Sequence, residues 1–371
     1  MSEHPLLADR LAKIEMSGIR RIFDLVQNMK GAIDLSLGQA HFDVPDEVKD
    51  AATKAMKDGF NRYTVTQGIP ELHSKLKATL TKKYNISVDN IIITGGASGG
   101  LFLSLLALVN PGDEVLVPDP YFVLYKHLVN VCGGKPVFVD TYPNFRLTAE
   151  NICKCITPKT KLLIFNNPVN PTGIAYTAEE IKSIAKVAKE HNLLIISDEI
   201  YENFIYDFPH EPMMRHYDNT LLISGFSKTY GMPGWRIGYA IGNKEIIDAM
   251  CMLQQFSFVC APAPVQKAVV SALDFDMSKY IAEYKRKRDF AYQELKDTFE
   301  VVKPQGAFYI FPRVPWGTDQ EFVKRAIDNN VLIVPGGAAS NRNTHFRLSY
   351  AAPDDKLAKG IGILKKIAKQ K

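Results

Sequence analysis

A lysine and an arginine stand close together in the segment LLISGFSKTYGMPGWRIGY, which covers residues 221–239. The segment starts with an apolar run typical of a buried strand, and Lys228 follows that run after a few small residues. Burial disfavours the charged form of a lysine, so it lowers the pKa and makes the amine a nucleophile. The pattern predicts a nucleophilic Lys228 near Arg236, with a surface lysine and a structural ion pair as the simpler alternatives.

A carboxylate also follows directly after a run of core residues. Asp198 comes after LLIIS, where a buried charge is costly unless it has a cationic or hydrogen-bonded partner. Tyr201 lies three residues further on, and Asn170 lies between two prolines in NPVNPTG. Each has an ordinary alternative, which is a helix N-cap for Asp198, half-buried packing for Tyr201 and a turn for Asn170.

A glycine-rich turn, GGASGG at 95–100, follows the apolar run IIIT and opens an apolar helix. The free amides of Ala97 and Ser98, together with the positive end of the helix dipole, can bind an anion. The spacing matches neither the Walker loop nor the dinucleotide fingerprint. A lysine nucleophile, a buried acid, an anion-binding helix end and an arginine together indicate a site for a phosphorylated, electrophilic, cationic ring.

These residues follow strands of a predicted parallel sheet. From about residue 90 to 242, continuous apolar runs alternate with helix-like stretches, which indicates a mainly parallel sheet covered on both faces. The predicted strands are 91–94, 114–118, 135–140, 161–165, 193–197, 220–224 and 236–242. Because ligands bind beyond the carboxyl ends of such strands, the polar residues should share one site. The clearest helix is 177–191, where Thr177 and Glu180 form a capping box.

The C-terminal part has a different pattern. Residues 278–299 predict a long amphipathic helix, followed by two short strands, AFYIF and HFRLSY, with the helix DQEFVKRAIDNN between them and another helix at the end. We expect an α/β fold with a large domain, built on a seven-stranded sheet, and a smaller α/β domain. The predicted ranges are 1–40 for the N-terminal segment of the small domain, 41–275 for the large cofactor-binding domain and 276–371 for the small C-terminal domain.

The composition bounds the possible functions. The chain has 371 residues and a net charge of +5 without a basic stripe, so no nucleic-acid partner is expected. The apolar run LFLSLLALV is too short to span a bilayer, so no membrane partner is expected. The five cysteines lack the spacing of a metal site, which favours reduced thiols, no metal and a cytoplasmic location.

With these motifs the chain resembles the class I/II aminotransferases of pyridoxal phosphate fold type I. NPVNPTG, SDEIY and SGFSKTYGMPGWRIGY carry the resemblance, which extends from IDLSLGQAHFDVP to HFRLSYA. It implies transfer of an amino group from an L-amino acid to a 2-oxo acid, with pyridoxal 5'-phosphate held by Lys228 as a Schiff base. A C–S β-lyase on the same scaffold is the alternative. A ligand-sensing regulator with this fold would need a DNA-binding domain, for which the roughly forty residues before HFDVP are too few.

The resemblance implies roles around the coenzyme ring. Lys228 would move the proton between the substrate and the coenzyme, while Asp198 would pair with the pyridinium nitrogen. Tyr201 and Asn170 would bind the phenolic oxygen, and Phe122 would stack on the ring.

Further residues would bind the phosphate and the substrate. The amides of Ala97 and Ser98, with Arg236 and less securely Ser227, match the phosphate site. Arg347 in HFRLSY would bind the substrate α-carboxylate, helped by the Gly38 amide and by Asn170, although an arginine in a short strand is often a surface ion pair. Tyr63 would reach the neighbouring active site, which implies a homodimer.

Some positions differ from the common pattern of the family. GQAHFDVP and GGASGG depart from it, and Phe122 stands where many aspartate-specific members have tryptophan. These differences weaken a prediction of a dicarboxylate substrate. A pocket near Ile19, Phe308 and Tyr309 could suit an apolar side chain.

Overall fold

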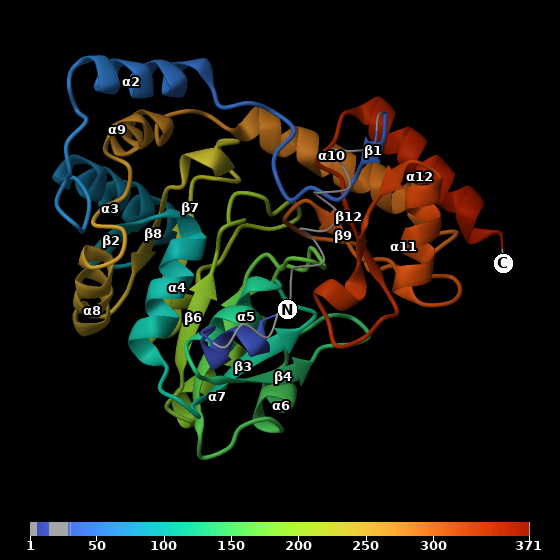
Figure 1. The fold of residues 1–371 in the computed structure, drawn as a ribbon, viewed down its shortest axis with the longest axis horizontal. Coiled ribbons are helices and arrows are strands. Elements are labelled where there is room, and N and C mark those ends of the chain that lie inside the picture. Colours follow the sequence, from blue (N-terminus) through green and yellow to red (C-terminus); the bar gives the residue numbers. More distant parts are fainter. Residues whose placement is uncertain (1–5, 15–28, 30, 371) are drawn as a thin grey trace.

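A computed structural model describes residues 6–14, 29 and 31–370. Its largest element is a seven-stranded sheet of order β2-β8-β7-β6-β5-β3-β4 (Figure 1). The strands are β2 Ile91–Thr94, β3 Glu114–Asp119, β4 Lys135–Asp140, β5 Thr160–Asn166, β6 Leu194–Asp198, β7 Thr220–Gly225 and β8 Gly238–Ile241. β8 is antiparallel to both its neighbours, and the other neighbouring pairs are parallel. The predicted mainly parallel sheet is confirmed.

Helices cover both faces because successive strand residues point to opposite sides. Val115 and Val117 of β3 belong to a core with α4 and α5, whereas Leu116 packs with residues of α7 on the other face. The helices of this part are α2 Asp46–Lys57, α3 Pro70–Tyr84, α4 Gly96–Leu108, α5 Leu124–Val131, α6 Ala149–Cys153, α7 Ala178–Glu190, α8 Lys244–Gln255 and α9 Ala263–Ala272. The capping box of Thr177 and Glu180 starts α7 as predicted.

The last predicted strand of the large sheet starts later than expected. β8 begins at Gly238, because the short 3-10 helix η3 Pro233–Trp235 and Arg236, with φ +54°, form a tight turn before it. Arg236 therefore lies in a turn at the edge of the sheet and outside the strand.

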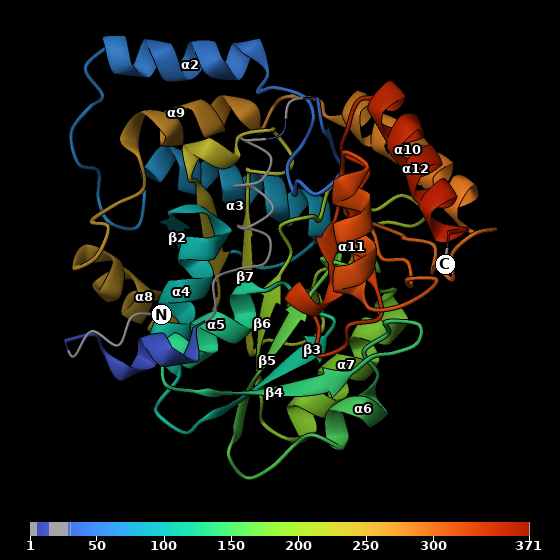
Figure 2. The same cartoon turned by 45° about the vertical axis from the view of Figure 1, so that its right-hand side comes forward.

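The C-terminal elements gather on one side of the large sheet (Figures 1 and 2). They include the helices α10 Ser278–Leu295, α11 Asp319–Asp328 and α12 Asp354–Ala368, and a small sheet of β11 Val334–Pro335, β12 Phe346–Ser349 and β9 Tyr309–Ile310. β1 Ile33–Asp34 pairs with β10 Val331–Leu332, so residues near 33 pack in the same core as this C-terminal part.

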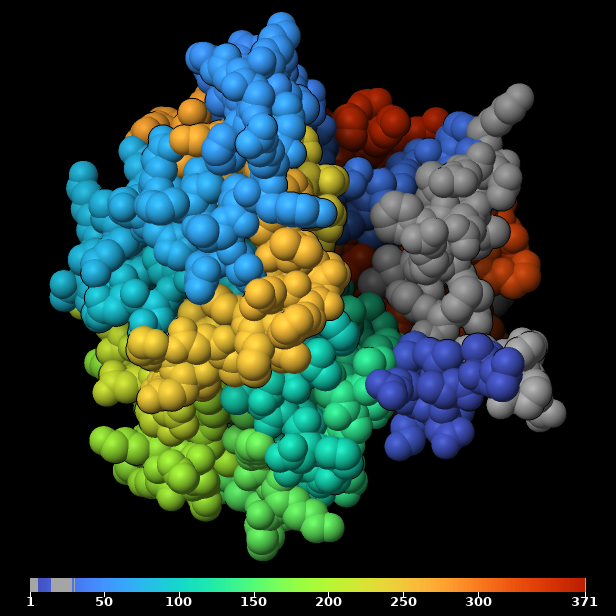
Figure 3. Space-filling model, turned by 60° about the vertical axis from the view of Figure 1, so that its left-hand side comes forward, coloured from blue at the N-terminus to red at the C-terminus, as the bar shows by residue number. Residues whose placement is uncertain are grey.

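The segment before β1 has a different neighbour. The 3-10 helix η1 Asp9–Lys13 lies against α5, where Asn130 Nδ2 donates to the Lys13 carbonyl at 3.3 Å (Figure 3). None of the helices in the described ranges combines the length and the hydropathy that a membrane span needs.

Candidate active site

The carboxyl ends of β3, β5, β6 and β7 meet at a cavity of about 300 Å³. Apart from Tyr63, the residues predicted to bind the coenzyme or the α-carboxylate line it, including Ser227. Tyr125, Asn166 and Tyr309 line it as well. The residues predicted from the strand ends therefore lie around one cavity. Asn166, Asp198 and Lys228 lie at or just after the carboxyl ends of the parallel strands β5, β6 and β7, so they meet at one edge of the sheet.

Asp198 is the last residue of β6 and is buried. Tyr125 on α5 donates its hydroxyl to Asp198 Oδ2 at 2.7 Å, and the Ile200 amide donates to Oδ1 at 3.2 Å. A turn follows Asp198 in place of the helix that an N-cap would start. Burial raises the pKa of Asp198 to about 6, although both hydrogen bonds act in the opposite direction.

Tyr125 was not predicted to belong to the site. It is fully buried on α5, three residues after Phe122. In the sequence it resembles any core aromatic residue, because only the tertiary structure brings its hydroxyl to the end of β6.

Lys228 follows β7 and extends into the cavity. Its Nζ donates to the Gly38 carbonyl at 2.5 Å and lies 5.9 Å from the centre of the Tyr201 ring. Loss of solvent lowers the pKa of Lys228 to about 8, and the positive charges of Arg347 and Arg236 act in the same direction. The amine is therefore more available as a nucleophile than a lysine in water.

The start of α4 is open toward the same cavity. No side chain caps the helix, so its first amides are available, and Ala97 and Ser98 line the cavity. Arg236 donates to the carbonyls of Gly95, at 3.1 Å, and Pro233, at 2.9 Å. Gly96 has a φ of +77°, and a Cβ there would lie 2.6 Å from Arg236 Nη2. A helix N-terminus and a guanidinium thus lie side by side, which suits a phosphate.

Arg347 on β12 is buried and bonds only to neutral groups. Its Nη1 donates to Asn170 Oδ1 at 2.9 Å, and its Nη2 donates to the Ser36 carbonyl at 2.8 Å. Among the described residues, Nε has no hydrogen-bond partner and no carboxylate pairs with this guanidinium. The alternative of a surface ion pair is therefore wrong for Arg347. A buried guanidinium without a carboxylate partner among these residues can bind an anionic ligand.

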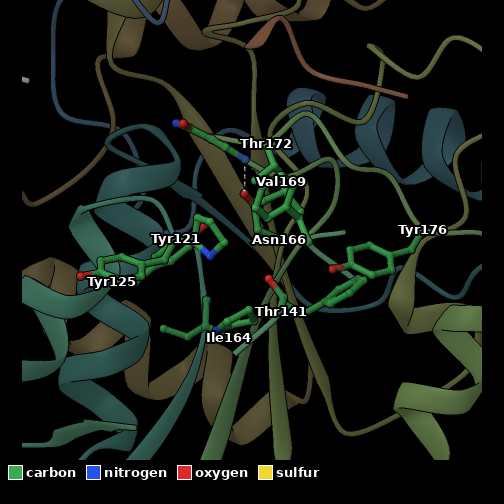
Figure 4. A pocket seen from close by; sticks show the side chains of 13 residues that line it. Tyr121, Tyr125, Thr141, Ile164, Asn166, Val169, Thr172 and Tyr176 are labelled. Carbon is green, nitrogen blue, oxygen red and sulfur yellow. Dashed lines mark hydrogen bonds between the residues drawn. The ribbon is translucent and has the colours of Figure 1, made fainter. Parts of the chain in front are cut away.

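A second, smaller space of about 20 Å³ lies behind the cavity and shares Tyr125, Asn166 and Asn170 with it. Figure 4 shows the side chains around it, with the Tyr176 hydroxyl pointing toward the Thr141 side. Asn166 Oδ1 accepts from the Asn170 amide at 2.8 Å, and its Nδ2 donates to the Asp198 carbonyl at 2.8 Å. Asn166, which the sequence argument missed, therefore fixes the Asn170 loop against β6.

The remaining predicted residues lie in different places. Tyr63 is 82% exposed and lies outside the cavity, beside a surface hollow that it shares with Phe258. Phe308 is fully buried in the C-terminal core and does not line the cavity, whereas Tyr309 does. Ile19 lies outside the residues that the structure describes.

Known proteins resemble the chain over nearly its whole length. Residues 30–362 match the family described as aminotransferase class I and II. A Methanocaldococcus jannaschii protein named "Probable aspartate aminotransferase" is 43% identical, covering 98% of this chain and 100% of that one. Aromatic-amino-acid aminotransferase 2 of Thermococcus litoralis is 35% identical, covering 98% and 99%. The structure of Thermus thermophilus aspartate aminotransferase with maleate has a TM-score of 0.93 at 32% identity, covering 97% and 99%.

These relatives do not favour the C–S β-lyase alternative, because they are named as aminotransferases. The family match, the parallel sheet and the lysine, aspartate and arginines around one cavity agree with each other. The chain belongs to the class I and II aminotransferases, which depend on pyridoxal phosphate.

Proposed function

We propose that the cavity binds pyridoxal phosphate through Lys228 and that the protein uses it to move an amino group from an L-amino acid to a 2-oxo acid. The residues fit the coenzyme, because an amine of lowered pKa, a buried carboxylate and an open helix N-terminus line one cavity. When bound, the coenzyme supplies an electron-accepting ring that stabilises negative charge at the substrate Cα.

The residues around the ring position act on protons. Lys228 accepts and returns the proton of the substrate Cα, because an amine with a pKa near 8 can serve as both base and acid. Asp198 holds a proton on the ring nitrogen. The Tyr125 hydroxyl orients the carboxylate through its hydrogen bond to Oδ2. Tyr201 donates to the phenolic oxygen, as does Asn170, whose Oδ1 is already engaged by Arg347.

A second group of residues holds the coenzyme in place. The amides of Ala97 and Ser98 bind the phosphate together with Arg236 and the Ser227 hydroxyl, all of which line the cavity. Phe122 lines the cavity and would stack on the coenzyme ring, and its own ring packs edge-on against Tyr125.

The observation that carries the proposed reaction is the buried guanidinium of Arg347, which has no carboxylate partner in the part of the chain that the structure describes. An α-carboxylate can bind it as a two-pronged ligand and satisfy the free Nε. The Gly38 backbone lies beside it in the same cavity. An amino acid held in this way presents its amino group to the coenzyme and its Cα to Lys228.

A substrate screen tests the function. The purified protein loaded with coenzyme is incubated with each of twenty amino acids and either 2-oxoglutarate or pyruvate, starting from aspartate and the aromatic amino acids that name its relatives. We expect a new amino acid formed from the oxo acid in at least one combination. Release of pyruvate and ammonia from cystathionine without amino transfer would contradict the proposal.

Attachment of the coenzyme should depend on pH through Lys228. Only the unprotonated amine attacks the aldehyde, so the rate for the coenzyme-free protein should rise about tenfold per pH unit below pH 8 and level off above it. The measurement is the rate of absorbance change after mixing with pyridoxal phosphate. A rate that still rises steeply at pH 10, as expected for an ordinary lysine, would contradict the lowered pKa.

Arg236→Ala should weaken coenzyme binding. The change removes a cation next to the helix N-terminus, and a hydrogen bond to a charged group contributes about 1.5–3 kcal/mol, so the dissociation constant should rise roughly 10- to 150-fold. Equilibrium dialysis of the coenzyme measures it. Arg215→Ala is the control, because Arg215 pairs with Glu211 at the surface outside the cavity. Equal affinities for the two variants would contradict the role of Arg236.

We also propose a homodimer in which Tyr63 reaches the phosphate of the neighbouring active site. Large apolar side chains are exposed near it, including Val65 at 58%, Phe256 at 85% and Phe258 at 51%. Residues 61–63 and residues 258–264 lie side by side on one face of the molecule (Figure 3). Because several large apolar side chains are exposed in the same region, this patch suits a subunit interface.

Mixing two inactive variants tests the shared site. Co-expressed Lys228→Ala and Tyr63→Ala chains should form hybrid dimers with one site that has both its own Lys228 and a partner's Tyr63. We therefore expect activity well above that of either variant alone. No gain in a mixture that sedimentation shows to contain dimers would mean that Tyr63 acts within its own subunit or not at all.

We also propose two domains and a cytoplasmic location. The ranges 1–40, 41–275 and 276–371 for the domains are supported by the pairing of β1 with β10. A cytoplasmic location is supported by five free cysteines, of which Cys251 is buried.

A further inference from the structure

Tyr309 touches three residues of the proposed site, whereas the sequence suggested it only as part of a pocket for an apolar side chain. It lies on β9 and is 1% exposed. Its hydroxyl is 2.8 Å from the Tyr201 hydroxyl, and its ring lies 4.6 Å from the Arg347 guanidinium carbon. A Cβ on Gly38 would collide with its hydroxyl oxygen.

We propose that Tyr309 is a positioning residue whose hydroxyl orients Tyr201 and whose ring supports Arg347. The inference rests on the proposed function, in which Tyr201 faces the coenzyme and Arg347 binds the α-carboxylate. The two contacts use different parts of Tyr309, so they can be separated by substitution.

The hydroxyl pair determines where the Tyr201 proton points. Burial raises the pKa of both tyrosines, so both keep their protons at neutral pH. Among the described residues, Tyr201 is the hydrogen-bond partner found for the Tyr309 hydroxyl. When Tyr309 donates to Tyr201, the Tyr201 proton remains free for an acceptor in the cavity. A hydroxyl that accepts a hydrogen bond is also a stronger donor.

The ring contact follows from the pairing of the strands. Ser349 of β12 lies opposite Tyr309 of β9, and Arg347 is two residues before Ser349 on the same face. The guanidinium therefore lies over the aromatic face, where its positive charge is attracted by the ring. This contact fixes Arg347 from one side, while Asn170 and the Ser36 carbonyl fix it from the other.

Two variants test the two contacts. Tyr309→Phe removes the hydroxyl and keeps the ring. In the protein loaded with pyridoxal phosphate, the pH midpoint of the visible absorbance should rise by about 0.2–0.7 unit, because a weaker donor at the phenolic oxygen leaves that oxygen a better proton acceptor. The affinity of the coenzyme-free protein for 3-phenylpropionate, a carboxylate that cannot react, should stay within about twofold of wild type, because the ring under Arg347 remains.

Tyr309→Leu removes the ring as well. Its affinity for 3-phenylpropionate, measured by calorimetry, should fall about 2- to 5-fold. Tyr350→Phe is the matched control, since it removes a buried hydroxyl that donates to the Ala307 carbonyl in the same small core, away from the cavity. This control should change neither readout.

The outcomes separate this inference from the proposed function. If the wild-type protein shows no visible absorbance from bound coenzyme, the proposed function fails. If it does, but Tyr309→Phe has the wild-type midpoint or Tyr350→Phe shifts it equally, the role of the Tyr309 hydroxyl is overturned. Unchanged carboxylate affinity in Tyr309→Leu would overturn the role of the ring.

Discussion

Lys228→Ala should abolish covalent attachment of pyridoxal phosphate and lower turnover by at least about 10³-fold. In the proposed function, the variant would lose both the amine that holds the coenzyme and the group that moves the proton at the substrate Cα. Attachment is measured by the mass of the chain after borohydride reduction, and turnover is measured with the best substrate pair from the screen.

The fold should survive this substitution. Lys228 faces the cavity, and its hydrogen bond to the Gly38 carbonyl joins it to one chain segment only. The thermal midpoint should therefore stay close to the wild-type value. Lys182→Ala is the control, since Lys182 pairs with Glu179 on the exposed side of α7. A Lys228→Ala protein that still carries covalent coenzyme would refute the assignment of the nucleophile.

Asp198→Asn is expected to have the second largest effect, a fall in turnover of about 10²-fold. The amide keeps the size of the side chain but carries no charge to hold the proton on the ring nitrogen. A charge-assisted hydrogen bond of about 1.5–3 kcal/mol corresponds to roughly 10- to 150-fold in rate. Steady-state kinetics at saturating coenzyme measure the effect, so that weaker binding does not contribute.

A neighbouring strand end provides the matched control for Asp198. Asp119 is also a buried carboxylate at the end of a strand, and burial raises its pKa as well. It accepts from the Asn341 amide at 3.1 Å and does not line the main cavity. Asp119→Asn should keep turnover close to wild type. If Asp198→Asn did the same, the carboxylate would not be the partner of the ring.

The strands and their polar ends were predictable because each strand carries its own local signal. Continuous apolar runs indicate burial on both faces, and parallel strands place their carboxyl ends at one edge. The sequence alone therefore predicted that Asp198 and Lys228 lie close together. The shortened β8 was less predictable, because the turn that holds Arg236 depends on packing against the start of α4.

The family, the mainly parallel sheet and the polar strand ends around the cavity could be predicted from the sequence, since they depend on residue type and order along the chain. Three features came from the tertiary structure: Arg347 is buried with no carboxylate partner among the residues described, Tyr125 donates to Asp198, and Tyr309 contacts both Tyr201 and Arg347. The reason is physical. An isolated aromatic residue or arginine in a short strand has the same local pattern whether it packs, pairs at the surface or faces a ligand, and contacts between distant segments select among these outcomes.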